Sequence, residues 1–164
     1  MKKFIQKNVL FIACLILFST GCKKDDNGPG IDAGSGKVTA SIDGTSWESK
    51  DGIDGAVFAS TQGTNIIQAY GSDGSYFGLT IIGNLSSGMT LSSDDGLFQA
   101  QYQPDFMELE AYIGIGNLGS GTTTITTFSS NKIKGTFEFT GGKANPDGSI
   151  SQKVISSGTY DIDF

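Results

Sequence analysis

The side chains available for chemistry in this chain are carboxylates, lysines and tyrosines. Its 164 residues include no histidine, and all 11 basic residues in the sequence are lysine, so arginine is absent as well. This composition excludes histidine-based catalytic triads, histidine metal sites and arginine clamps for phosphate. General acids, bases and nucleophiles would therefore have to be Asp, Glu, Lys or Tyr.

Glu108 and Glu110 are an acidic pair to consider, because they lie two residues apart on a predicted strand and so point to the same face. A glycosidase needs two carboxyl groups that face each other across a sugar, about 5–9 Å apart. Such an enzyme would require a cleft in which two members of this set converge: Glu48, Asp94, Asp95, Glu108 and Glu110. Nothing in the sequence indicates that cleft. We predict that the chain is not an enzyme, and keep a carboxylate-based hydrolase as an alternative.

Two other motifs are better explained as turns. Residues 114–119 (GIGNLG) match GxGxxG, but a threonine-rich strand sequence follows where a dinucleotide site needs the N-terminus of a helix. The acidic turns at 51–55 (DGIDG) and 94–96 (DDG) lack the full calcium loop with its distal glutamate. We predict no cofactor and no metal site, and leave open whether the Asp-Gly turns bind calcium.

Aromatic side chains near strand ends are the remaining candidates for ligand binding. Sugar rings dock on exposed aromatic faces, while neighbouring Asp and Asn side chains accept hydrogen bonds from sugar hydroxyls. The candidates are Trp47, Tyr70, Tyr76 and Tyr102. Trp47 follows the Asp-Gly-Thr turn at 43–45, where it could serve either as a platform on the rim or as a plug in the core.

Alternation of apolar and polar residues recurs along the chain and predicts the elements that position these side chains. In 132–140, for example, Ile133, Phe137 and Phe139 share one face, and polar residues take the other. Asp-Gly, a dipeptide of tight hairpin turns, occurs six times, and no stretch has a sustained helical period. Strands are predicted near residues 37–43, 46–50, 56–60, 65–71, 75–83, 88–92, 97–103, 106–115, 121–128, 131–140 and 153–164.

One dry and one wet face per strand is typical of antiparallel sheets. We therefore predict an all-β fold with a single antiparallel domain. Its architecture is a two-sheet sandwich or a flattened up-and-down barrel, because alternation is identical in the two.

The N-terminus has the pattern of a secretory signal peptide. Lys2, Lys3 and Lys7 form a basic region, and residues 9–18 are an unbroken apolar run of ten. A helix that spans a bilayer needs about 20 residues, so this run is too short. We predict that residues 1–21 are removed.

Small residues followed by Cys22 resemble a bacterial lipobox, although Ser19 stands where the usual pattern has leucine. The resemblance implies that Cys22 is acylated and becomes the mature N-terminus, with residues 22–36 as a flexible tether and residues 37–164 as the β domain. The residues KKDD at 23–26 resemble the surface-export signal of some Gram-negative lipoproteins. We expect a lipid-anchored protein of the outer membrane, on the cell surface.

Removal of residues 1–21 takes away three of the 11 lysines and none of the 17 acidic residues, which leaves a formal charge of −9. Such a surface repels nucleic acid, so no nucleic-acid partner is expected.

Three stretches together resemble a family of small Gram-negative outer-membrane lipoproteins with a β-rich domain of unknown function: VTASIDGTSWES (38–49), GSGTTTITTFSSNKIKGTFEFTGG (119–142) and ISSGTYDIDF (155–164). The resemblance implies a location and an all-β fold, and no catalytic residues. We expect a non-catalytic, membrane-anchored surface lipoprotein that binds a glycan or a partner protein, or serves in envelope assembly. An alternative is a β-barrel that carries a small apolar ligand, which would require an unfilled interior with inward Gly and Ala.

Overall fold

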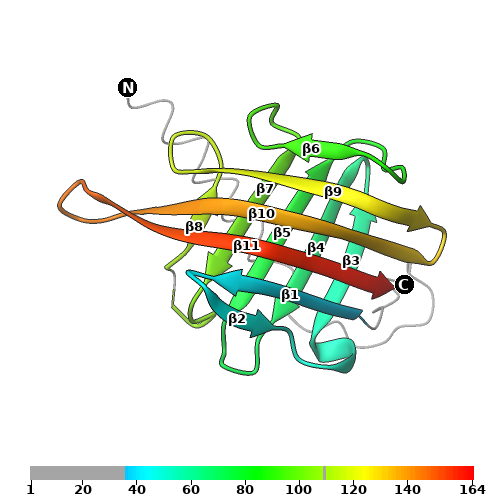
Figure 1. The fold of residues 1–164 in the computed structure, drawn as a ribbon, viewed down its shortest axis with the longest axis horizontal. Coiled ribbons are helices and arrows are strands. Elements are labelled where there is room, and N and C mark those ends of the chain that lie inside the picture. Colours follow the sequence, from blue (N-terminus) through cyan, green and yellow to red (C-terminus); the bar gives the residue numbers. More distant parts are fainter. Residues whose placement is uncertain (1–35, 109) are drawn as a thin grey trace. The chain divides into compact units, whose positions relative to one another are not determined.

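The computed structural model describes residues 36–108 and 110–164, and all of its regular elements but one are strands. The exception is a single 3-10 turn, η2 (Gly52–Asp54). The strands are β1 (Gly36–Ile42), β2 (Thr45–Glu48), β3 (Ala56–Thr61), β4 (Thr64–Tyr70), β5 (Tyr76–Ile82), β6 (Thr90–Ser92), β7 (Phe98–Gln103), β8 (Tyr112–Gly114), β9 (Ser120–Ser129), β10 (Lys132–Ala144) and β11 (Ile150–Asp163). The prediction of an all-β, antiparallel domain is confirmed (Figure 1).

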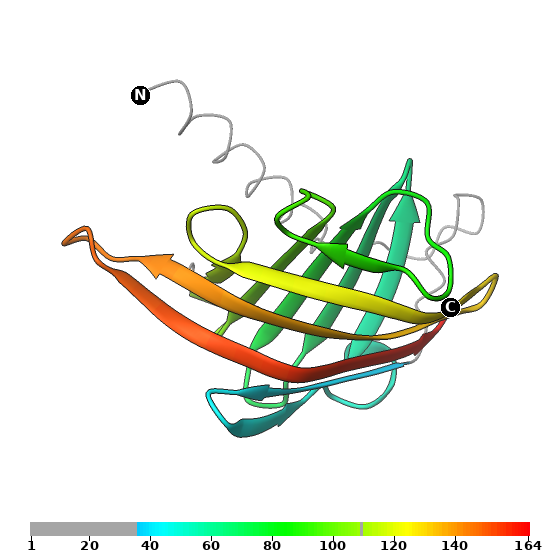
Figure 2. The same cartoon turned by 45° about the horizontal axis from the view of Figure 1, so that its top comes forward.

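The strands belong to one sheet that curls into a half-barrel with two crossing layers. The front layer runs β2-β1-β11-β10-β9-β6, and the back layer runs β3-β4-β5-β7-β8. Figure 2 shows the long front strands bending across the steeper back strands. β10 joins the layers at one corner, where Gly142 pairs with Ile113 of β8, and a bridge between Ser49 and Gly71 joins them at another. The sheet is thus continuous, as in a barrel, while its layers face each other, as in a sandwich.

Aromatic rings that lie over inward glycines fill the space between the layers. A Cβ added at Gly121 would lie 2.5 Å from Cβ of Phe139, and one added at Gly158 would lie 2.7 Å from the ring of Phe137. Gly135 is covered in the same way by the ring of Tyr160. Rings therefore fill the space beside the inward glycines. These glycines do not provide the unfilled interior that a carrier of an apolar ligand would need.

Local sequence explains most of the turns. Asp43 and Gly44 at the β1–β2 hairpin have φ of 49° and 85°, as a type I′ turn requires. Of the six Asp-Gly pairs, five have a glycine with positive φ, and Gly55 in the turn after η2 is the exception.

The predicted strand over 106–115 is wrong in its first half. Residues 106–108 form a turn instead, in which the N–H of Met107 donates to Oδ1 of Asp105 and the N–H of Phe106 donates to the carbonyl of Gly74. Met107, which the alternation placed inward, is 87% exposed. Tertiary contacts of Phe106 with rings on β4 and β5 hold the segment in this turn, so only Tyr112–Gly114 remains as strand.

The predicted signal peptide (1–21), the acylated Cys22 and residues 22–35 of the predicted tether lie outside the described residues. Within the described part of the chain, no helix is long and apolar enough to cross a membrane.

Substitution of Gly135 by Ala should destabilise the domain by about 1–3 kcal/mol, because the new methyl group would displace the ring of Tyr160 from a filled core. Urea unfolding measures this change. Thr136→Val, on the exposed side of the same strand, is the control and should stay within about 0.5 kcal/mol of the wild type. Equal stability of the two variants would contradict the packing described here.

Candidate functional site

The four aromatic residues predicted to bind a ligand separate into two pairs in different places. Tyr70 on β4 and Tyr76 on β5 project from the outer side of the back layer, where they pair with each other across the strands. Trp47 on β2 and Tyr102 on β7 belong to the buried core and line a pocket at its end. The two surfaces are described in turn.

The outer side of the back layer carries no charged residue, and we call it the uncharged face. It consists of the outward positions of five paired strands: Val57, Ala59, Thr61, Thr64, Ile66, Gln68, Tyr70, Tyr76, Gly78, Thr80, Ile82, Gln99, Gln101, Gln103 and Ile113. On an ordinary protein surface roughly 25–35% of residues are charged, so about four or five of these fifteen positions would be expected to carry a charge. The complete absence of charged residues from these positions, in a chain whose formal charge is −6, calls for an explanation.

Glutamine amides and apolar side chains share the middle of the uncharged face. One row crosses all five strands in register and consists of Val57, Gln68, Gly78, Gln101 and Ile113. At Gly78, where a side chain is missing, the hydroxyl of Tyr76 occupies the space.

One end of the uncharged face is a small aromatic cluster. The rings of Tyr70, Tyr76 and Phe106 lie 5.1–5.5 Å apart. Tyr76 is 2% exposed, accepts a hydrogen bond from the amide of Gln68 at 3.2 Å, and has its pKa raised by burial. Tyr76 is therefore a support beneath the surface, while Tyr70 and Phe106 keep part of their rings accessible.

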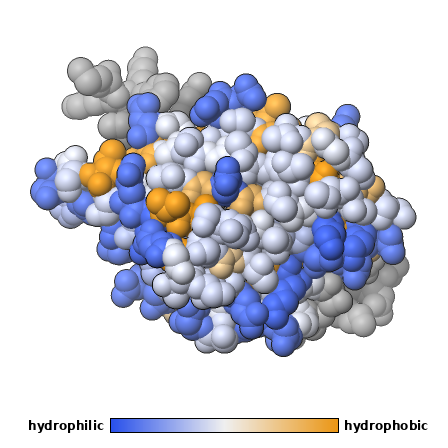
Figure 3. Space-filling model, viewed as in Figure 1, coloured by the Kyte–Doolittle hydropathy of each residue, from blue (hydrophilic) through white to orange (hydrophobic). Residues whose placement is uncertain are grey.

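The outer side of the front layer is different in character. Threonines Thr39, Thr90, Thr124, Thr136 and Thr159 lie in one row across five of its strands. Ion pairs flank this row, among them Lys37–Glu48 and Lys134–Asp161, both at 3.0 Å. Figure 3 shows this side, with pale residues over its centre and blue ones mainly along its left and lower parts.

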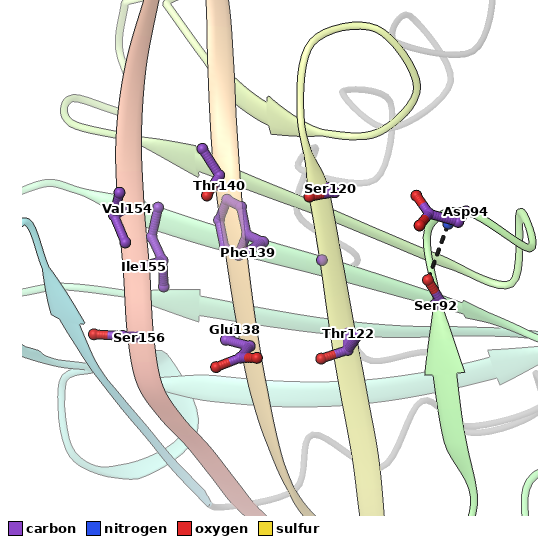
Figure 4. A pocket seen from close by; sticks show the side chains of 11 residues that line it. Ser92, Asp94, Ser120, Thr122, Glu138, Phe139, Thr140, Val154, Ile155 and Ser156 are labelled. Carbon is purple, nitrogen blue, oxygen red and sulfur yellow. Dashed lines mark hydrogen bonds between the residues drawn. The ribbon is translucent and has the colours of Figure 1, made fainter.

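A shallow groove of about 270 Å³ lies on this front side, between the end of β6 and strands β9, β10 and β11 (Figure 4). Asp94 and Glu138 line it, together with hydroxyl groups of Ser92, Ser120, Thr122, Thr140 and Ser156. The groove adjoins an irregularity in β11, where Ser157 has φ of 51° and the pairing with β1 and β10 shifts.

Among the five carboxylates considered for a hydrolase, only Asp94 lines this groove. Glu48 is paired with Lys37, and Glu110 with Lys143 at 2.8 Å. Glu108 and Glu110 do not share a strand face as predicted, because residues 108 and 110 lie outside the strands. No group of three or more Cys, Asp or Glu side chains that could hold a metal ion occurs within residues 36–108 and 110–164.

The GxGxxG segment connects two strands, β8 and β9, that both pair with β10. It therefore has no following helix whose N-terminus could receive a pyrophosphate.

The pocket at the end of the core, which we call the mouth pocket, has a volume of about 380 Å³. Its wall includes Trp47, Tyr102 and Ile42, and its rim includes Asp43 and Lys153. Trp47 is 6% exposed, and its ring meets that of Phe77 edge-on at 4.6 Å between centroids. Trp47 is thus mainly a core residue, with an edge that reaches the pocket.

A chain of hydrogen bonds fixes the ring of Trp47 to the β4–β5 turn. Its indole N–H donates to Oγ of buried Ser75 at 2.5 Å, and the hydroxyl of Ser75 donates to Asp73. Burial acts to raise the pKa of Asp73, but the hydrogen bonds from the hydroxyl and the N–H of Ser75 outweigh it and hold the pKa below its ordinary value.

An ion pair at the rim of the mouth pocket joins two segments that are far apart in the chain. Nζ of Lys153 donates to Asp43 at 2.7 Å, and the N–H of Val154 donates to the same carboxylate at 2.9 Å. These two hydrogen bonds lower the pKa of Asp43, and the first raises the pKa of Lys153. Burial raises the pKa of Tyr102, and the carboxylate of Asp73 adds to the shift.

Ser75→Ala should lower the free energy of unfolding by about 1–3 kcal/mol, because it leaves the buried indole N–H of Trp47 without its acceptor. Trp47 is the single tryptophan, so its fluorescence follows unfolding in urea. The exposed neighbour Ser72, changed to Ala, is the control and should change stability by less than about 0.5 kcal/mol. If Ser75→Ala left the free energy of unfolding unchanged, the indole N–H would have another hydrogen-bond partner.

Asp73→Asn should make stability less dependent on acid pH. Because the pKa of Asp73 is lower in the folded chain than the value of about 3.9 typical of unfolded chains, its stabilising effect is present above pH 4. That effect is lost as the pH falls through the folded-state pKa. The stability difference between wild type and Asp73→Asn should therefore shrink between pH 6 and pH 2. A stability difference between wild type and Asp73→Asn that does not change with pH would contradict this assignment.

Comparison of the chain with protein-family models, curated proteins and solved structures gave no match. The assignment of a function therefore rests on the surfaces and pockets described above.

Proposed function

We propose that this chain is a lipid-anchored, non-catalytic binding module of the outer membrane that holds a neutral polysaccharide at the cell surface. The observation that carries the proposal is the uncharged face, five strands wide, in a strongly acidic chain. A face free of charge fits a partner that is itself uncharged.

The side chains of the uncharged face match the chemistry of a sugar polymer. Each glutamine amide both donates and accepts hydrogen bonds, as each sugar hydroxyl does. Gln99, Gln101 and Gln103 alternate along β7, so their side chains repeat about every 7 Å along the strand. Aliphatic side chains and the accessible edge of Tyr70 lie beside them and suit the apolar C–H faces of sugar rings.

A neutral polysaccharide fits this surface better than other polymers. Burial of an unpaired charge is unfavourable by several kcal/mol, and the uncharged face offers no cation or anion to compensate a charged polymer. Interfaces with proteins are also poor in charge, but they are enriched in arginine and large aromatic residues. This chain has no arginine, and the middle of the uncharged face has glutamines, while its aromatic rings are confined to one end.

The predicted lipid anchor makes weak binding sufficient. If Cys22 is acylated, residues 23–36 hold the domain at most about 50 Å from the membrane, and many anchored copies meet one polymer at once. Repeated weak contacts along the polymer then add up to firm attachment without a deep pocket.

Affinity electrophoresis of the mature chain, with Cys22→Ser to remove the acylation site, tests the proposal. Gels that contain a neutral polymer (dextran, mannan, xylan or a β-glucan) should retard the protein, and a gel that contains anionic alginate should not. Gln101→Lys places a charge at the centre of the uncharged face and should weaken retardation at least tenfold, which is about 1.4 kcal/mol.

Thr136→Lys is the matched control, because it adds the same charge to the front layer and should leave retardation unchanged. Two results would overturn the proposal: no retardation by any neutral polymer, or equal retardation of Gln101→Lys and the wild type. Retention of a partner protein through the uncharged face, without polysaccharide binding, would assign the face to that protein instead.

A further inference from the structure

The mouth pocket contains a hydroxyl group that makes no hydrogen bond to another described residue of the protein. Tyr102 is 7% exposed and lines the pocket, and its hydroxyl has no hydrogen-bond partner among the described residues. The other two buried tyrosines are both satisfied: Tyr76 accepts from Gln68, and the hydroxyl of Tyr160 lies 3.0 Å from that of Thr123. No side-chain nitrogen or oxygen of the described residues is both buried and without a partner, so the hydroxyl of Tyr102 is accessible at the pocket. There it can donate a hydrogen bond to a bound molecule and accept one from it.

The rim of the pocket is polar but electrically balanced. Asp43 and Lys153 neutralise each other at 2.7 Å, and Asp43 is held further by the N–H of Val154. An anion or a cation would have to compete with this pair. A neutral ligand with both donors and acceptors can use the remaining N–H groups of Lys153 and the lone pairs of Asp43 while the pair stays intact.

The rest of the pocket combines hydroxyl groups with an apolar wall. Thr45 and Ser46 add hydroxyls at the rim, while Ile42 and the edge of Trp47 form an apolar side. The volume of about 380 Å³ lies at the small end of the range for ligand sites, which is about 300–1,000 Å³. A molecule with several hydroxyls, one apolar face and a compact ring satisfies all of these features.

We propose that the mouth pocket binds one neutral monosaccharide unit, either a free sugar or the end of a glycan chain. The hydroxyl of Tyr102, Lys153 and Asp43 form the polar contacts, and Trp47 forms the apolar wall. This second site rests on its own geometry and does not depend on the uncharged face.

Fluorescence titration of the mature chain tests the pocket directly, because Trp47 is the single tryptophan and lies in its wall. Glucose, galactose, mannose and N-acetylglucosamine are the probes, each beside its linear tetrasaccharide. At least one sugar should change the emission of Trp47 with saturation. If the pocket takes free sugars, the monosaccharide binds as tightly as the tetrasaccharide; if it takes chain ends, the tetrasaccharide binds more tightly.

Two tyrosine variants separate ligand binding from structure. Tyr102→Phe should weaken sugar binding about 3–10-fold, the effect of one hydrogen bond, and leave the Tm unchanged because its hydroxyl has no partner among the described residues. Tyr160→Phe should do the reverse, since it removes the contact with Thr123 and lowers the Tm without altering sugar binding.

Three results would overturn the inference: no saturable change with any sugar, an unchanged Kd for Tyr102→Phe, or a stronger response to zwitterionic glycine or anionic glutamate than to sugars. Gln101→Lys should leave this titration unaffected. A chain that binds a neutral polymer but no sugar in this titration would therefore refute the mouth pocket alone, and the converse would refute the uncharged face alone.

Discussion

The packing of aromatic rings over inward-facing glycines is the interaction on which the rest of this structure depends. Phe139 lies over glycines of two different strands, Gly114 of β8 and Gly121 of β9. Because these positions have no side chain, one ring can contact both backbones while β10 pairs with both strands. The same arrangement places Phe137 over Gly158 and fills the interior, so ligand chemistry is confined to the outer surfaces and the open end.

The filled interior explains why the two candidate sites lie where they do. Most aromatic rings point inward. Apart from the cluster of Tyr70, Tyr76 and Phe106, the outer sides of the layers carry smaller or polar side chains. The front layer has threonines and ion pairs on its outer side, whereas the outer side of the back layer is neutral. At the end of the core the inward positions of β11 change from Ile155 to Lys153, and this change creates the polar rim of the mouth pocket.

Short-range patterns in the sequence were enough for the strands, their buried faces and most turns. Phe77, Leu79 and Ile81, assigned to one face by alternation, are all fully buried, and Asp43-Gly44 forms the predicted hairpin turn. The prediction failed over residues 106–108, 110 and 111, where alternation continued but Phe106 packs against rings of β4 and β5. Alternation of apolar and polar residues indicates which side chains share a face of a strand. It contains no information about contacts with rings from another part of the chain, which can hold the same segment in a turn.

The sequence by itself determined the class of fold, the absence of histidine and arginine chemistry, and four aromatic candidates. Only the tertiary structure decided how they are used. Tyr70 and Tyr76 belong to a neutral face assembled from five strands, whereas Trp47 and Tyr102 meet Asp43 and Lys153 at a pocket. The physical reason is the range of the interactions: alternation and turn chemistry act over a few residues, while strand pairing joins positions 110 residues apart, as in the contact between Asp43 and Lys153.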